Sequence, residues 1–193
     1  MDDQDTQKPE NQGLRALQKQ TIVGMIAAAV LCGLIGSALW YGADGTLFVT
    51  ADRYIDTSDR LAYVAKWSMV PAIFLMMGVG MIANKRFFTD DIDPLAGPND
   101  RELQIWRRYT QNTLEQGFLL IVGFAAFAHI TYPYWLRLIP IIAILFGIGR
   151  ILFIIGYLIK PTFRATGFGM TFYPIVILYA ITVYQYIYVC ELI

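Results

Sequence analysis

Long apolar segments dominate this sequence and restrict it to one class of fold. The hydrocarbon core of a bilayer is about 30 Å thick, and a helix of about 20 apolar residues crosses it. Five segments of that length and character are present, near residues 21–41, 61–83, 110–132, 138–159 and 168–190. Because 56% of the 193 residues are hydrophobic and only 16% are charged, little sequence remains for a soluble domain. The sequence therefore predicts an all-α, multi-pass transmembrane helical bundle.

The segments at the two ends of the chain carry separate predictions. Residues 1–20 are polar and acidic, which predicts a flexible cytoplasmic tail without a fold of its own. Residues 21–41 form an apolar stretch longer than the core of a typical signal peptide, which favours a retained span over a cleaved signal. Pro174 lies near the start of the last segment, where the first turns of a helix lack internal acceptors and tolerate proline.

The distribution of Lys and Arg predicts the orientation in the membrane. One group of connecting segments carries Lys8, Arg15, Lys19, Lys85, Arg86, Arg101, Arg107, Arg108, Lys160 and Arg164. The opposite group carries only Arg53, Arg60, Lys66 and Arg137. The positive-inside rule then places the N-terminus in the cytoplasm and the C-terminus across the membrane. The formal net charge is zero and no large basic surface is evident, so we expect no nucleic-acid partner.

A charged run enters the third apolar segment. A helix from about Asp100 to about Tyr132 is roughly 48 Å long, so its first three turns project beyond the hydrocarbon. Arg108, Asn112 and Glu115 have the spacing i, i+4, i+7 and share one face of this helix. A carboxylate inside the membrane is costly, so Glu115 is expected to face the bundle and pair with Arg150. The alternative is that this pair only holds two helices together.

A second polar face is predicted in the fourth segment. Arg150, Phe153 and Tyr157 follow the spacing i, i+3, i+7, and Arg164 comes after the break at Pro161. The two faces end at the same depth, so they predict a pocket that opens on lipid and whose arginines suit carboxylates or phosphates. Its predicted lining is Arg108, Asn112, Glu115, Arg150, Tyr157 and Arg164.

The remaining unusual residues indicate packing rather than chemistry. His129, the single histidine, lies near the far end of the third segment, where an interfacial position is expected. Cys32 and Cys190 are far apart and fit no metal-binding spacing, so no metal site is predicted. Glycines inside the apolar segments most simply allow close approach of helices. These glycines are Gly78, Gly80, Gly147, Gly149 and Gly156.

Two motifs resemble the MAPEG proteins, the membrane-associated proteins of eicosanoid and glutathione metabolism. Residues 108–115, RYTQNTLE, are similar to the Arg-x-x-x-Asn-x-x-Glu motif at the start of that family's second helix. Residues 149–164, GRILFIIGYLIKPTFR, resemble its third helix, and residues 82–88, IANKRFF, resemble the basic end of its first. The resemblance covers residues 61–190. The additional span at 21–41, with its acidic tail, resembles the family's mattrin-like branch.

The resemblance implies a homotrimer of four-helix bundles, here with one additional N-terminal helix, that holds glutathione between neighbouring subunits. Arg164 would stabilise the thiolate of this co-substrate. A thiol titrates near 8.5, and lowering its pKa by about two units requires about 2.7 kcal/mol of differential stabilisation. A lipophilic electrophile or a lipid hydroperoxide would enter from the bilayer. The implied glutathione-binding residues are Arg108, Asn112, Glu115 and Tyr157, with Lys85 or Arg86 from the preceding helix.

Two departures keep other functions open. Phe153 stands where some eicosanoid-conjugating relatives have a tyrosine, and Gln116 stands where leukotriene C4 synthase has another. The family also contains members that bind lipid or regulate partners without catalysis, so a non-catalytic lipid-binding or regulatory protein is the alternative to a glutathione transferase or peroxidase. A channel or transporter needs a polar path through the membrane and is the least favoured class, because the polar residues gather in one half.

Overall fold

The computed structural model describes residues 3–42, 56–88 and 101–190, with side chains for residues 14–42, 56–88 and 101–188. Within these ranges the secondary structure is helical, and five long helices are apolar enough to span a membrane, as predicted. They are α1 (Asp3–Gly42), α2 (Thr57–Phe87), α3 (Arg101–Ile130), α4 (Leu138–Ile159) and α5 (Arg164–Cys190). A short 3-10 helix, η2 (Pro133–Arg137), precedes α4.

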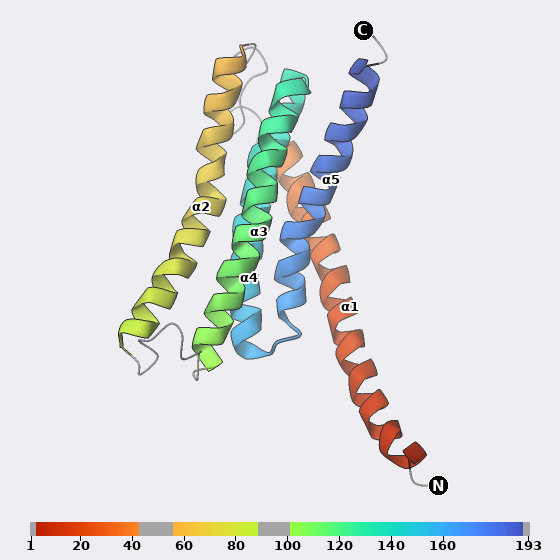
Figure 1. Ribbon diagram of the computed structural model, residues 1–193. Coiled ribbons are helices and arrows are strands. Elements are labelled where there is room, and N and C mark those ends of the chain that lie inside the picture. Colours follow the sequence, from red (N-terminus) through yellow and green to blue (C-terminus); the bar gives the residue numbers. More distant parts are fainter. Residues whose placement is uncertain (1–2, 43–55, 89–100, 191–193) are drawn as a thin grey trace.

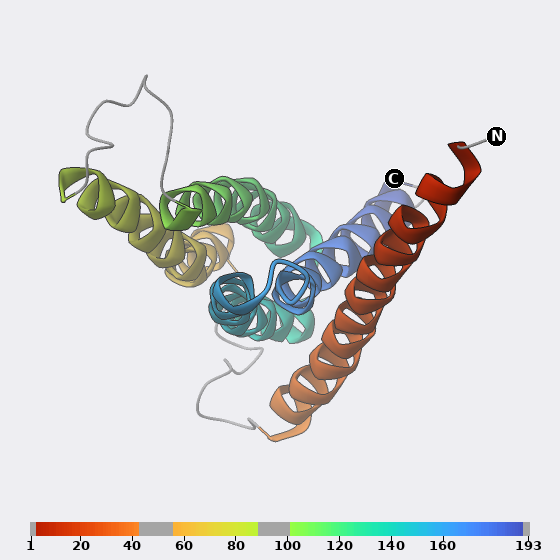
Figure 2. The ribbon, with the colours of Figure 1, turned by 90° about the horizontal axis from the view of Figure 1, so that it is seen from below.

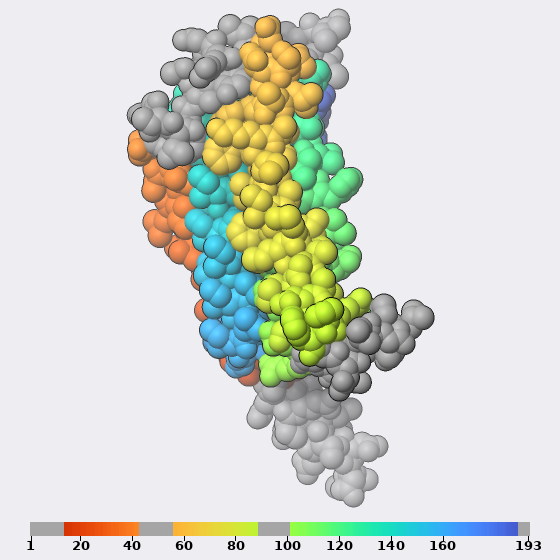
Figure 3. Space-filling model, turned by 90° about the vertical axis from the view of Figure 1, so that its left-hand side faces the viewer, coloured from red at the N-terminus to blue at the C-terminus, as the bar shows by residue number. Residues whose placement is uncertain are grey.

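Helices α2 to α5 form a four-helix bundle, and α1 lies outside it (Figures 1 and 2). Around the bundle the order is α2, α3, α5, α4, and α2 covers the seam between α3 and α4 (Figure 3). Helix α1 packs mainly on α5 and touches α4. The chain therefore has a four-helix core with one additional N-terminal helix against its α5 side.

Two of the connections between helices and the N-terminal part of α1 lie at the lower end of the molecule, at the bottom of Figure 1. Helix α2 ends there, α3 begins there, and α4 turns into α5 there, while the N-terminus of α1 points the same way. This arrangement places the basic residues Arg86, Arg107 and Arg164, from three different helices, near the same end of the molecule. The prediction that these three segments share one side is confirmed, and the assignment of that side to the cytoplasm stays a prediction.

Two apolar clusters fill the bundle. The larger one contains Phe124, Phe127 and Phe146, which are at most 1% exposed, and it joins α3, α4 and α5 in the upper part of the molecule. The smaller one packs aromatic rings of α3 against α4 near the lower end and supports the site described below. Its buried members are Ile105, Trp106, Tyr109, Phe153, Ile154 and Tyr157.

Small residues let α1 approach α5 closely. A Cβ added at Gly24 would lie 3.1 Å from the Cβ of Ala165, and one added at Gly169 would lie 2.7 Å from the Cβ of Ala28. Ala28 is fully buried, although most of α1 is exposed. Each helix contributes two small residues four positions apart, which is the pattern that allows membrane helices to pack at short distance.

A proline in α5 creates a polar contact with α1. Helix α5 starts at Arg164, so Pro174 lies eleven residues into it rather than near its start, and that expectation was wrong. Proline has no N–H, so the carbonyl of Met170 loses its helical donor. The thiol of Cys32 donates to this carbonyl at 3.6 Å. Cys32 therefore compensates a defect in the neighbouring helix.

The expectation that residues 1–20 have no fold was also wrong for the backbone, because α1 begins at Asp3. Residues 14–20 are exposed but consist of Leu, Arg, Ala, Gln and Lys, which are all good helix formers. A helix that is already nucleated in the span extends through such a segment at little cost.

Candidate functional site

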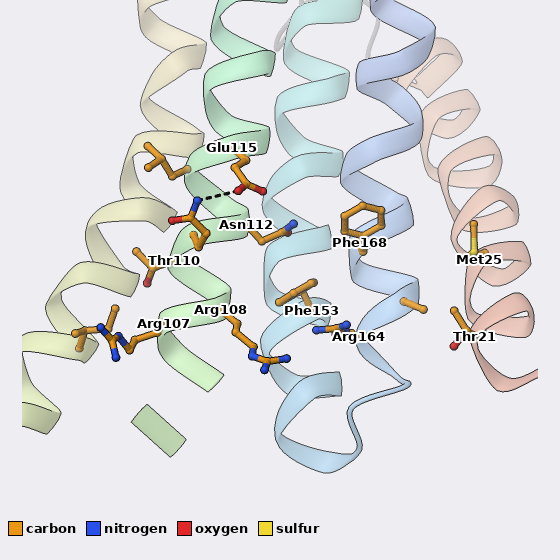
Figure 4. A pocket seen from close by; sticks show the side chains of 14 residues that line it. Thr21, Met25, Arg107, Arg108, Thr110, Asn112, Glu115, Phe153, Arg164 and Phe168 are labelled. Atoms are coloured by element: carbon orange, nitrogen blue, oxygen red, sulfur yellow. Dashed lines mark hydrogen bonds between the residues drawn. The ribbon is translucent and has the colours of Figure 1, made fainter. Parts of the chain in front are cut away.

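A pocket of about 880 Å³ opens in the lower half of the molecule, between α3 on one side and α1 and α5 on the other (Figure 4). All five long helices contribute to it. Its lining consists of Thr21, Met25, Ile82, Arg107, Arg108, Thr110, Gln111, Asn112, Leu114, Glu115, Phe153, Arg164, Ala165 and Phe168.

The face of α3 predicted from the sequence lines this pocket. Arg108, Asn112 and Glu115 all take part, as their spacing on one helix face requires. Sequence reasoning missed Gln111, whose side-chain amide donates to the carboxylate of Glu115 at 2.8 Å. The i, i+4 spacing of these two residues was the available signal.

The predicted pairing of Glu115 with Arg150 is wrong. Glu115 is exposed to the pocket, whereas Arg150 is fully buried and does not line it. Arg150 instead donates to Asn112, Thr113, Gln116 and Thr171, and no described carboxylate pairs with it. Residues 115 and 116 are neighbours in sequence and point about 100° apart on a helix, so Gln116 faces α4 and Glu115 does not.

The contact with Arg150 fixes the orientation of Asn112. Nη1 of Arg150 donates to Oδ1 of Asn112 at 2.8 Å. A guanidinium has only donors, so the atom that faces it must be the amide oxygen. The amide NH₂ of Asn112 is then left to donate toward the pocket it lines (Figure 4). Arg150 is thus a positioning residue that presents a donor to a ligand.

Two arginines from different helices converge on one phenol. Nη1 of Arg108 in α3 donates to the Tyr157 hydroxyl at 3.4 Å, and Nη1 of Arg164 in α5 donates to the same oxygen at 3.2 Å. The Arg164 guanidinium also lies 5.0 Å from the centre of the Tyr157 ring. Tyr157 is buried and stacks on Phe153 with ring centres 5.9 Å apart. Like charges are therefore held close together with no carboxylate between them among the described residues, which favours an anion at this position.

The two sides of the pocket differ in chemistry. The α3 side carries polar and charged groups, while Met25 of α1, Phe153 of α4 and Phe168 of α5 contribute apolar lining. The charged lining residues are three arginines and one carboxylate, namely Arg107, Arg108, Arg164 and Glu115. Such a surface suits an amphipathic anion.

Lys85 and Arg86 do not reach this pocket. Lys85 forms an ion pair with Glu102 at the lower ends of α2 and α3, and neither basic residue is among the lining side chains of the single chain. Their implied contact with a ligand stays a prediction. Within the described ranges, no three histidine, cysteine or carboxylate side chains gather as metal ligands would.

The fold and the site define a multi-pass integral membrane protein with a cationic, half-apolar pocket near one end of a helical bundle. The chain belongs to the MAPEG family, whose profile matches residues 61–184, from α2 to most of α5. Helix α1 precedes the matched region.

Curated relatives refine this placement. The chain is 25% identical over 166 residues to Transmembrane protein 79 of Mus musculus, covering 86% of this chain and 42% of that protein. It is 25% identical over 153 residues to Transmembrane protein 79 of Bos taurus, covering 79% of this chain and 38% of the relative. The chain thus spans about two fifths of the length of these relatives. They represent the mattrin branch, which confirms the predicted placement. No solved structure matches the chain significantly.

Proposed function

We propose that this chain binds glutathione in the pocket between α3 and α5 and presents its thiolate to lipophilic electrophiles or lipid hydroperoxides. The observation that carries this proposal is the convergence of Arg108 and Arg164 on the Tyr157 hydroxyl. The motif shared with the family supplies the ligand class, and the cationic, half-apolar lining is consistent with it.

The polar side of the pocket matches the groups of a glutathione tripeptide. Glutathione carries two carboxylates, one ammonium group and two peptide units. Arg107 and Arg108 suit the carboxylates, because guanidinium groups bind carboxylates bidentately. The exposed Glu115 suits the ammonium, and the amide NH₂ of Asn112 suits a peptide carbonyl. This assignment uses each polar group in the role its charge allows.

Arg164 is the candidate for the thiolate. Its side chain lines the pocket, between Arg108 of α3 and the residues of α1 (Figure 4). A guanidinium within contact distance favours the thiolate over the thiol, and exclusion of water strengthens that effect. Tyr157 would act as the positioning residue that holds the Arg164 side chain.

The chemistry requires only glutathione and the second substrate. In conjugation, the thiolate sulfur forms a bond to an electrophilic carbon, and the displaced electron pair leaves with a leaving group or takes up a proton. In peroxide reduction, the sulfur attacks the peroxide oxygen, and a second glutathione releases the first as a disulfide. The products of the second reaction are an alcohol, water and oxidised glutathione.

Assembly and orientation belong to the same proposal. We infer a homotrimer from family membership, and the wide exposure of apolar side chains on α2, such as Met76 at 69%, leaves surface for neighbours or lipid. The basic lower end would face the cytoplasm, because Lys and Arg flanking spans are enriched on that side.

A non-catalytic lipid-binding or regulatory role is the second candidate. The residue that stands in place of a tyrosine of leukotriene C4 synthase, Gln116, is buried against Arg150 and does not line the pocket. The tyrosine of that relative therefore has no counterpart among the described lining residues. A polar path across the bundle has no support among the described residues, since Phe124, Phe127 and Phe146 fill the bundle above the site.

Calorimetry with detergent-purified protein tests the proposal. Saturable glutathione binding that Arg108→Ala weakens at least about tenfold, as expected for loss of a charged hydrogen-bond partner, supports it. The absence of binding to the wild-type protein contradicts it. Turnover of an aryl halide or an alkyl hydroperoxide then separates the enzyme from the non-catalytic binder.

A further inference from the structure

Helix α1, which lies outside the matched four-helix region, reaches the candidate site. Thr21 and Met25 are one helical turn apart and line the pocket on the side opposite α3 (Figure 4). The remaining lining comes from helices of the matched region, residues 61–184. The additional helix therefore supplies one wall of a pocket that is otherwise built by the family core.

The position of this wall is set by tight packing at the same depth. Gly24 lies between the two lining residues in sequence, and a Cβ there would come within 3.1–3.2 Å of Ala165 and Thr166. Ala165 itself lines the pocket, so the contact that docks α1 also bounds the cavity. At the adjacent edge, Thr162 donates a hydrogen bond of 3.1 Å to the side-chain oxygen of Gln20.

The chemistry of the α1 wall differs from that of α3. Met25 is an unbranched thioether, which adapts to ligands of different shape, and Phe168 faces the same side of the pocket from α5. Arg164 lies between this apolar pair and the charged groups of α3 (Figure 4). A ligand whose anionic part occupies the α3 side would direct a substituent from the Arg164 region toward α1.

We propose that Met25 and Phe168 form a subsite for the lipophilic substituent of the second substrate, with α1 as its specificity-determining wall. This inference rests on the proposed function, which identifies the anionic part of the ligand as glutathione. It adds that the additional helix selects the substrate, so a chain with the same core and a different α1 would accept different hydrophobic groups.

Binding of S-alkyl glutathione conjugates to the full chain in lipid nanodiscs tests this subsite. The affinity of the wild-type protein should increase from the methyl to the hexyl conjugate, by up to about fourfold for each fully buried methylene. Met25→Trp should fill the subsite, weaken S-hexylglutathione at least tenfold and leave glutathione unchanged. Met25→Ala should weaken the hexyl conjugate less, again without an effect on glutathione. Equal affinities for S-hexylglutathione in all three proteins would overturn the proposal.

Ile26→Trp is the matched control, because Ile26 is the next residue of α1, is 59% exposed and does not line the pocket. Ile26→Trp should bind glutathione and S-hexylglutathione like the wild type. If it loses as much affinity for S-hexylglutathione as Met25→Trp does, the proposed subsite is wrong. If neither glutathione nor its conjugates bind to the wild-type protein, the proposed function fails. In that case, binding of a fluorescent fatty acid to the wild type, Met25→Trp and Ile26→Trp tests the α1 wall alone. Weaker binding only by Met25→Trp supports the wall, and equal binding by all three proteins overturns it.

Cysteine cross-linking tests the wall without a ligand. In a background of Cys32→Ser and Cys190→Ser, Gly24→Cys combined with Thr166→Cys should form a disulfide on mild oxidation. Ile26→Cys combined with Thr166→Cys should not, because residue 26 is turned away from α5. Failure of the first pair to cross-link while the second pair reacts would place α1 elsewhere and overturn the proposal.

Discussion

The side-chain carbonyl of Asn112 accepts a hydrogen bond of 2.8 Å from the buried guanidinium of Arg150. This contact joins α3 to α4 and decides which end of the Asn112 amide faces the pocket. A cation that does not touch the pocket therefore determines what the pocket can bind. The buried charge has no described carboxylate partner, and it is stabilised by amide and hydroxyl oxygens and by the rings of Phe146 and Phe153, each 5.1 Å away.

Asn112→Asp should separate folding from ligand binding. A carboxylate at this position would pair with Arg150 and retain or increase the melting temperature, since a buried cation gains a counter-charge. The pocket would lose its amide donor and gain a negative charge, so we expect glutathione affinity to decrease about tenfold or more. Thermal unfolding and calorimetry on the same preparation measure both effects. Unchanged glutathione affinity would contradict the assigned role of Asn112.

Tyr157→Phe should weaken ligand binding while the aromatic packing persists. The ring remains available to stack on Phe153 and to lie beneath Arg164, whereas the oxygen shared by the two arginines is lost. Arg108 and Arg164 are exposed, so the loss of binding free energy should be at the lower end of the range for charged hydrogen bonds. We expect about 1.5 kcal/mol, which corresponds to about a tenfold increase in the Kd for glutathione. Tyr132→Phe, at a residue that is 76% exposed and far from the pocket, is the control and should bind normally.

Gly167→Ala should destabilise the contact between α4 and α5 at the depth of the pocket. A Cβ at residue 167 would overlap the backbone nitrogen of Phe153, so one of the two helices has to move. The expected cost is about 1–3 kcal/mol, as for other overpacked positions, and it is read from the denaturation midpoint. Gly33→Ala is the matched control, because nothing lies within 4 Å of its added Cβ, and it should be neutral or slightly stabilising. Equal effects of the two substitutions would contradict the close approach.

Cys32→Ala and Cys32→Ser should differ in stability. Serine retains a donor for the Met170 carbonyl, which Pro174 leaves without its helical partner, whereas alanine retains none. We expect the alanine variant to lose about 0.5–1.5 kcal/mol relative to serine, measured by thermal unfolding in one detergent. A serine variant no more stable than the alanine variant would show that this contact contributes nothing.

Periodicity accounts for the parts of the site that the sequence predicted. The spacing of Arg108, Asn112 and Glu115 fixes one helix face whatever the tertiary packing, so their common location in the pocket followed from the sequence alone. The hydrogen-bond partners of Arg150 were not predicted correctly. Pairing it with the nearest opposite charge ignores the rotation of about 100° between successive residues of a helix. Asn112 and Gln116, four residues apart, were the signal for the true partners.

The place of α1 could not be predicted from its hydropathy. Apolar composition predicts a span but not the neighbour on which the span packs, since lipid is as apolar as the partner helix. The small residues Gly24 and Ala28 on α1, and Ala165 and Gly169 on α5, carried that information. That these small residues of α1 and α5 face one another becomes apparent only when both helices are placed. This packing is what brings Thr21 and Met25 to the pocket.

Thiolate absorbance of bound glutathione tests the central claim most directly. Difference spectra of the purified protein with saturating glutathione should show a thiolate band at a pH where the free thiol is protonated. Arg164→Ala should abolish the band while the fold persists and the glutathione affinity stays within about tenfold of the wild type. An undiminished thiolate band in the Arg164→Ala protein, or no band in the wild type despite saturation, would contradict the proposed thiolate site.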